Sequence, residues 1–398
     1  MTSFTRLIVA FLALVSYRGV AAWPVFQNTS TAREGQNRYS VAAASYTLPR
    51  LVVYFQTTHD SATGEPISML PLITEKGIAL THLIVCSFHI GQPATATTAA
   101  TPLHLNDYPP SDARFTTLWQ EAAMLQAAGV RVMGMVGGAA AGSFTTSTLD
   151  STDEDLYEAA YGQLHDAIAA YGLQGMDLDV EQSMSQAGIT RLVQRLKSDF
   201  GPAFEVTLAP VASALRPDGA GANLSGFSYA TLATATASTD SAGDGISFYN
   251  AQFYNGFGSL ATPADYEAIV SPTESLWTTD QVLLGEITAP SEGSGYIAPG
   301  TLNATVVALR DFYGPDKPLG GIMGWEYFDS APGGTSAPWQ WAQDMTAILR
   351  PGLTPALSVT VHDAKRLKVA YEASAVANGG RISAAAASSI NYMALVNA

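Results

Sequence analysis

Short runs of β-branched and apolar residues alternate eight times with longer segments of helical period between residues 50 and 345. Alternating strands and helices imply a parallel sheet covered by helices. Eight such units over about 300 residues predict an α/β fold that closes into a (β/α)8 TIM barrel. The expected strands are Leu51–Gln56, Leu83–His89, Val130–Val136, Leu173–Glu181, Phe204–Pro210, Ile246–Tyr254, Val282–Ile287 and Gly320–Trp325.

Two of the intervening segments carry a clear apolar stripe. The first is Asp153–Tyr171, with Thr152 as a candidate N-cap, and the second is Ile189–Phe200. Apolar residues three or four positions apart predict a helix with one buried face. Both segments therefore fit the outer layer of a barrel.

Composition narrows the function classes. Hydrophobic residues make up 47% of the 398 residues and charged residues 13%, which is enough to bury a full core. The excess of 34 acidic over 19 basic residues argues against nucleic acid or an anionic membrane as a partner. A neutral ligand such as a sugar is compatible with this excess of negative charge. The one cysteine, Cys86, excludes a disulfide framework, and we expect no metal, no cofactor and a monomer.

The N-terminus has the pattern of a secretory signal. Arg6 precedes the apolar run Leu7–Val15, and small residues precede Trp23. Such a run is too short to span a bilayer, and no later run is long enough to do so. Sequons at Asn28, Asn223 and Asn303 agree with export. We expect a secreted, extracellular glycoprotein whose charge changes from −15 to −17 when Arg6 and Arg18 leave with the signal.

The expected domain organisation has four parts. A signal peptide over residues 1–22 is followed by an irregular lead-in over 23–46. A single catalytic barrel occupies 47–350, and an extension rich in alanine and serine occupies 351–398.

The fourth expected strand carries three acids on one face. Acidic and apolar residues alternate in the segment 176–181, so Asp177, Asp179 and Glu181 share one side. In a barrel these carboxylates face the interior, and Glu181 lies at the C-terminal mouth, where barrel enzymes have their active sites. Three such charges in a poorly hydrated interior cannot all stay ionised, so one must hold or share a proton. This arrangement suits acid catalysis on a leaving-group oxygen.

The pattern Gly175-x-Asp177-x-Asp179-x-Glu181 resembles the signature of glycoside hydrolase family 18, which comprises chitinases and endo-β-N-acetylglucosaminidases. The family's motif usually opens with Asp, where this chain has Gln174, which can hydrogen-bond but cannot share a proton. Four further segments resemble the family in the same order, including the Gln-Phe-Tyr-Asn of the hevamine-like class III branch. They are Leu51–Tyr54, Gly137-Gly138 with Gly142–Phe144, Gln252–Asn255 and Gly321–Trp325, although Met135 stands where Ser is usual.

The resemblance implies a retaining, substrate-assisted mechanism. Glu181 would act as general acid and base, and the substrate's own acetamido group would attack the anomeric carbon. Asp179 would orient that group, and Asp177 would support Asp179 from below. Tyr254 would hydrogen-bond the acetamido oxygen, and Trp325 would form the apolar floor of the sugar site.

Further substrate contacts are expected around these residues. The candidates are Gln252, Asn255, Tyr54, Phe88 and Gly138, with core packing as the alternative for Tyr54 and Phe88. The first hypothesis is a chitinase that acts on N-acetylglucosamine polymers. The second is an endo-β-N-acetylglucosaminidase that cuts the chitobiose core of N-glycans. A third is a sugar-binding barrel without hydrolysis.

Overall fold

A computed structural model describes most of the chain. The described residues are 48–93, 99–237, 245–356, 359–360, 362–366 and 369. The signal peptide, the lead-in, the sequon at Asn28 and most of the C-terminal extension lie outside them. Within the described residues, no helix is both long and apolar enough to cross a membrane.

Eight parallel strands close into a barrel, as the alternation predicts. Each strand pairs with the next one around the ring, and β1 pairs with both β2 and β9. A short strand, β3, pairs in the antiparallel direction with Phe88 and His89 at the C-terminal end of β2. The strands are β1 (Arg50–Phe55), β2 (His82–His89), β3 (His104–Leu105), β4 (Arg131–Gly137), β5 (Gly175–Asp179), β6 (Glu205–Leu208), β7 (Phe248–Gln252), β8 (Val282–Ile287) and β9 (Gly321–Trp325).

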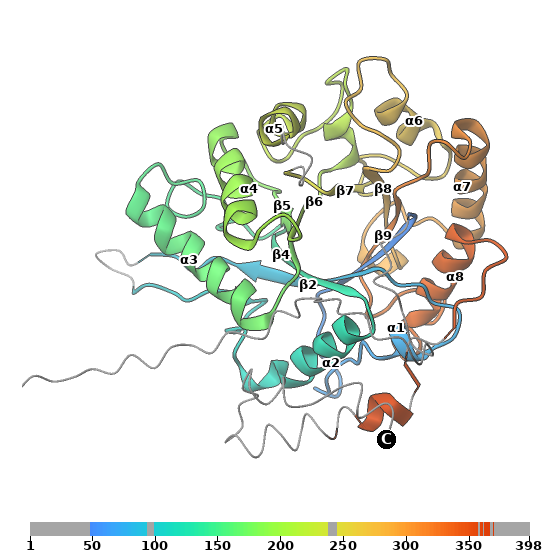
Figure 1. The fold of residues 1–398 in the computed structure, drawn as a ribbon, viewed down its shortest axis with the longest axis horizontal. Helices are drawn as coiled ribbons and strands as arrows, with labels where there is room; N and C mark the ends of the chain where they lie inside the picture. The colour runs from blue at the N-terminus through green and yellow to red at the C-terminus, as the bar shows by residue number, and fades with distance from the viewer. Residues whose placement is uncertain are drawn as a thin grey trace, which may run out of the picture.

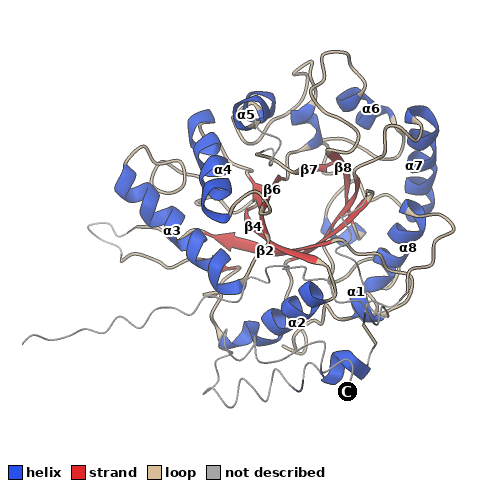
Figure 2. Ribbon diagram, viewed as in Figure 1, coloured by secondary structure: helices blue, strands red, loops and turns tan. Residues whose placement is uncertain are grey.

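Helices form an outer ring around the strands (Figures 1 and 2). The helix α3 begins after an N-cap at Asp153, whose carboxylate accepts a hydrogen bond from Leu156 N at 3.2 Å, so the expected cap at Thr152 is wrong by one residue. The helices are α1 (Pro71–Thr74), α2 (Thr116–Ala127), α3 (Glu154–Tyr171), α4 (Gln186–Phe200), α5 (Tyr229–Thr236), α6 (Ala264–Val270), α7 (Pro299–Tyr313) and α8 (Trp339–Leu349). Short 3-10 turns occur at Ala113–Phe115, Ala212–Leu215, Pro290–Glu292 and Gly334–Ser336.

Two hydrophobic cores result from the alternation of side chains along the strands. The larger core lies between the strands and the helices, and it contains Met176, Leu178 and Val180 of the β5 segment. The smaller core lies within the barrel and includes Tyr54, Ile84 and other residues of the opposite strand faces. The apolar face of β5 therefore packs outward, as predicted, and the acidic face is directed inward.

Candidate active site

Three carboxylates follow one another from the barrel interior to its mouth. Asp177 and Asp179 lie on β5, and Glu181 lies two residues beyond its end. Asp177 is fully buried, Asp179 is 5% exposed, and Glu181 is partly exposed. The site therefore has one partly exposed acid at the mouth and two buried acids below it.

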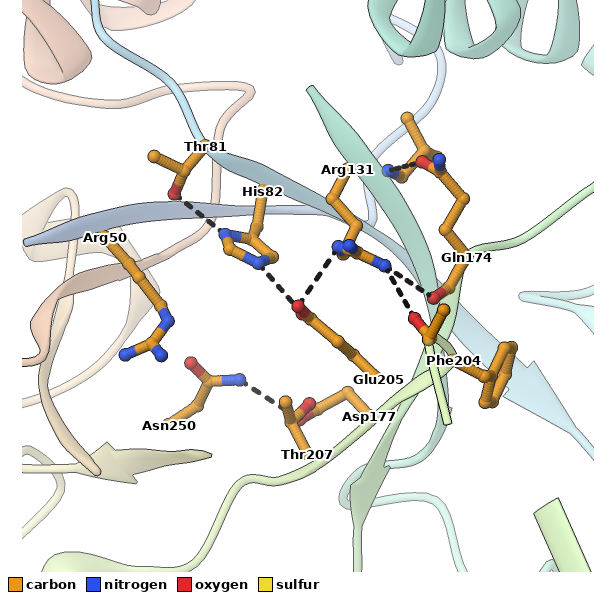
Figure 3. A network of polar contacts seen from close by, with 12 residues as sticks. Arg50, Thr81, His82, Arg131, Gln174, Asp177, Phe204, Glu205, Thr207 and Asn250 are labelled. Carbon is orange, nitrogen blue, oxygen red and sulfur yellow. Dashed lines mark hydrogen bonds and ion pairs between the residues drawn. The ribbon is translucent and has the colours of Figure 1, made fainter. Parts of the chain in front are cut away.

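The lowest acid, Asp177, is surrounded by hydrogen-bond donors from three other strands. It accepts from Tyr54 Oη at 2.7 Å, from Thr207 Oγ1 at 2.5 Å and from Asn250 Nδ2 at 3.1 Å. Figure 3 shows Thr207 and Asn250 beside this carboxylate. Burial raises the pKa of Asp177 above its ordinary value, although the three hydrogen bonds favour its charged form. Sequence reasoning did not identify Thr207 and Asn250. Their signal in the sequence is weak, because a single threonine or asparagine in a short strand does not indicate what it contacts.

Gln174, which stands in place of the usual aspartate, contacts a neighbouring strand. Its Oε1 accepts a hydrogen bond from Val132 N at 3.0 Å, on β4 (Figure 3). Among the described residues, no hydrogen bond joins Gln174 to Asp177. The departure from the family motif therefore leaves all three donors to Asp177 in place.

The two upper acids are bridged by one amide group. Gln252 Nε2 lies 3.2 Å from Asp179 Oδ1 and 3.3 Å from Glu181 Oε1, and it also donates to Ala209 O at 2.9 Å. Burial raises the pKa of Asp179 well above its usual range, and the negative charges of Glu181 and Asp177 raise it further. Asp179 therefore keeps a proton at a pH at which an ordinary aspartate has lost it. The direction of this shift agrees with the expectation that one of the three acids holds or shares a proton.

Three further residues expected in the site, Tyr254, Trp325 and Gly138, lie at or just beyond the ends of their strands. Tyr254 is 6% exposed, and burial raises the pKa of its hydroxyl well above the ordinary value, so the group is available as a neutral donor. The Trp325 ring packs against the Tyr54 ring with centroids 5.6 Å apart. Gly138, with φ of +86°, donates its N–H to Asp179 O at 2.9 Å. A Cβ at Gly138 would lie 3.8 Å from the Asp179 carboxylate, so glycine leaves the space beside this acid open.

Comparison with known proteins identifies the family. No family model and no curated protein matches the chain. Among solved structures, a fungal endo-β-N-acetylglucosaminidase from glycosyl hydrolase family 18 is 57% identical, with a TM-score of 0.70, and the match covers 77% of this chain and 100% of that one. The chain belongs to glycoside hydrolase family 18. The resemblance inferred from the acid motif is thus confirmed, and the protein is a glycoside hydrolase.

Two further structures extend the comparison. The chitinase ChiC from Aspergillus fumigatus is 40% identical to this family 18 enzyme, with a TM-score of 0.62, over 75% of this chain and 98% of that one. A putative chitinase A from Streptomyces coelicolor is 20% identical, with a TM-score of 0.53, over 76% of this chain and 98% of that one. The second likeness shows the shared fold alone.

One expected cleft residue, Phe88, lies in the outer core of this family 18 barrel. Ile84 and Cys86 of β2 point into the barrel, and unbroken alternation would turn Phe88 inward as well. The register between β2 and β4 shifts between Val85 and Phe88, which inserts one extra residue as a β-bulge. Phe88 therefore faces outward and packs against Trp119 of α2, with ring centroids 6.5 Å apart. The alternative of core packing is correct for this residue.

Asn255 is exposed and holds two loops of the enzyme together. Its Oδ1 accepts from Ser294 N at 2.9 Å, and its own N–H donates to Ser294 O at 2.8 Å. This pair joins the end of β7 to the segment after β8. The contact between Asn255 and a sugar stays a prediction.

Glu326, next to Trp325, connects the ends of β9 and β1. This buried carboxylate accepts hydrogen bonds from Gln56 N at 2.9 Å and from Thr57 N and Thr57 Oγ1, both at 2.7 Å. Its neighbour Trp325 packs on Tyr54, two residues before Gln56. Glu326 thus fixes the relative positions of the two strands that carry these rings, which is a structural role.

The Tyr54 hydroxyl offers a test of the Asp177 environment. In the Y54F variant, Asp177 loses one donor that stabilises its charged form, so the pKa of Asp177 rises further. We expect the acidic limb of the pH–kcat profile to move to higher pH by about one unit. Circular dichroism checks that the fold is unchanged, and an unshifted profile would show that this hydrogen bond does not influence turnover.

Proposed function

We propose that this enzyme hydrolyses the β-1,4 bond between two N-acetylglucosamine residues with net retention, by substrate-assisted catalysis. The observation that carries the proposal is the pair formed by Glu181 at the mouth and the buried Asp179, bridged by Gln252 Nε2. A donor beside the glycosidic oxygen and a second acid that orients the acetamido group are the two functions that this reaction requires.

Each residue has a distinct task in the proposed reaction. Glu181 donates its proton to the glycosidic oxygen while the acetamido oxygen attacks the anomeric carbon, so the C–O bond breaks as an oxazolinium ion forms. Asp179 binds the acetamido nitrogen and stabilises its positive charge, and Tyr254 donates to the acetamido oxygen. Glu181 then takes a proton from the water that opens the ring. Trp325 is the apolar floor against the sugar.

The substrate is proposed to be an N-glycan first and chitin second. Both contain the same bond between two N-acetylglucosamine residues. The sequence alone favours chitin, but the chain is 57% identical to an endo-β-N-acetylglucosaminidase and 40% identical to a chitinase. The higher identity supports an endo-β-N-acetylglucosaminidase that cuts the chitobiose core of N-glycans.

A product analysis tests this proposal. Purified enzyme is incubated in parallel with a high-mannose glycoprotein and with a chitin pentamer, and products are identified by mass and by anomeric form. Glycan release that leaves one N-acetylglucosamine on the protein supports the first substrate, and pentamer cleavage supports the second. An initial β-anomer supports retention. Binding of either substrate without cleavage would favour the sugar-binding barrel instead.

Secretion, an extracellular location and a monomeric state belong to the same proposal and are supported by the sequence. Expression of the full chain with sequencing of the secreted N-terminus tests the first two. The expected mature protein begins at Trp23. Size-exclusion chromatography with light scattering tests the third.

A further inference from the structure

A tight turn of residues 105–108 lies on the C-terminal ends of β1 and β2. Leu105 and Tyr108 exchange two backbone hydrogen bonds, of 2.8 and 3.2 Å. Between them, Asn106 adopts φ of +52°, donates its N–H to Ser87 O at 2.9 Å and accepts from Ser87 N at 3.1 Å. Its Nδ2 also donates to Gln56 O at 2.9 Å. Of these five hydrogen bonds, the three made by Asn106 hold the turn to the ends of β1 and β2.

The turn presents an aromatic ring to solvent. Tyr108 is 42% exposed, and the guanidinium carbon of Arg114 lies 3.6 Å from the centroid of its ring. This cation–π contact covers one face of the ring and holds its plane in place. Asp112 fixes the backbone of Arg114 by accepting its N–H at 2.9 Å. A large aromatic ring that is both exposed and already ordered loses little conformational entropy when a ligand stacks on it.

The turn that carries this ring is bonded to β2 beside the acids. Ser87 Oγ and Asp179 Oδ2 both lie 3.8 Å from the position of a Cβ on Gly138, so Ser87 flanks the same small space as Asp179. Asn106 is bonded to Ser87, and Tyr108 follows two residues later, which is at most about 7 Å of extended chain. An oligosaccharide with one residue at Asp179 and further residues directed over β2 would therefore reach Tyr108.

We propose that the open face of Tyr108 binds a sugar ring of the substrate at a distance from the bond that is cleaved. The C–H face of a neutral pyranose stacks on an aromatic ring, and the ligand class is an outer residue of an N-acetylglucosamine oligomer or of an N-glycan. The chain's charge of −15 agrees with a neutral ligand. This inference rests on the proposed function and adds a second contact surface to it.

The test compares long and short substrates of the class that the wild-type enzyme cleaves. For chitin oligomers these are the hexamer and the shortest cleaved oligomer, and for N-glycans they are the full high-mannose glycan and its trimmed core. The Y108A variant is expected to lose about 3- to 10-fold in kcat/KM on the long substrate and to be unchanged on the short one. Y108F, which keeps the ring, is expected to match wild type.

A matched control is F312A, which removes another exposed aromatic. Phe312 is 65% exposed in the last turn of α7, and a barrel helix runs antiparallel to its strands, so it lies at the opposite face from the mouth. F312A is expected to leave the ratio of the two kcat/KM values unchanged. An active Y108A enzyme with the wild-type ratio would overturn the Tyr108 proposal alone. A wild-type enzyme that cleaves neither class would overturn the proposed function, and this inference with it.

Discussion

Replacement of Glu181 by glutamine is expected to slow hydrolysis by about 10³-fold while the substrate still binds. The variant keeps the size of the side chain and an oxygen that can accept from Gln252 Nε2, which lies 3.3 Å from Glu181 Oε1 in the native enzyme. It removes the only proton that the proposed mechanism delivers to the leaving group. Turnover of an oligosaccharide and its binding to E181Q by calorimetry measure the two effects separately.

The control for this prediction is E274Q, which removes the same charge at an exposed position after α6. It is expected to hydrolyse substrate at the wild-type rate. If E181Q retained wild-type turnover, the general acid would lie elsewhere and the assignment of the site would be wrong. If E181Q lost binding as well as turnover, Glu181 would also contribute to substrate affinity in the ground state. The loss in kcat/KM would then have to be divided between substrate binding and the chemical step.

The strand pattern and the acid face could be predicted from sequence because both depend on local alternation. The range of β8, Val282–Ile287, is identical to the expected strand, and the other seven barrel strands differ from the expected ones at their ends by at most two residues. The alternation of acids with Met176 and Leu178 determines which face of β5 is buried against the helices. Such signals lie within a few consecutive residues, so they can be recognised without knowledge of the rest of the fold.

Contacts between distant segments could not be predicted in this way. The bulge that turns Phe88 outward is a change of register between β2 and β4, and one strand's sequence does not reveal it. The donors of Asp177 come from positions 54, 207 and 250, which only closure of the barrel brings together. Glu286 is a third case, because a single acid in an apolar strand gives no indication of what it contacts.

Glu286 is a buried carboxyl group outside the active site. It lies on β8, is 1% exposed, and accepts one hydrogen bond from Trp341 Nε1 of α8 at 3.1 Å. Its Oε2 is buried and has no hydrogen-bond partner among the described residues. Burial raises the pKa of Glu286 to about 8, although the hydrogen bond from Trp341 favours the charged form. The carboxyl group is therefore protonated in the folded enzyme at neutral pH.

This raised pKa makes stability depend on pH in a defined direction. In the unfolded chain Glu286 titrates near its ordinary value of 4.5, whereas in the folded enzyme it keeps its proton to about pH 8. Between these values the folded state holds the extra proton, so the free energy of unfolding falls as pH rises, by about 1.4 kcal/mol per unit. At pH 7 the free energy of unfolding is about 3 kcal/mol lower for this reason, and below pH 4.5 this loss of stability is absent.

The E286Q variant is expected to remove this pH-dependent loss of stability. Glutamine imitates the neutral carboxyl group, and its Oε1 can accept from Trp341 as before. We expect E286Q and wild type to melt at the same temperature at pH 4.5 and E286Q to melt about 5 °C higher at pH 7.5. E274Q, which removes an exposed carboxylate, is expected to show no such divergence. Parallel melting curves for E286Q and wild type across this range would show that Glu286 titrates alike in the folded and unfolded states. The surroundings of Glu286 would then have to solvate its charge.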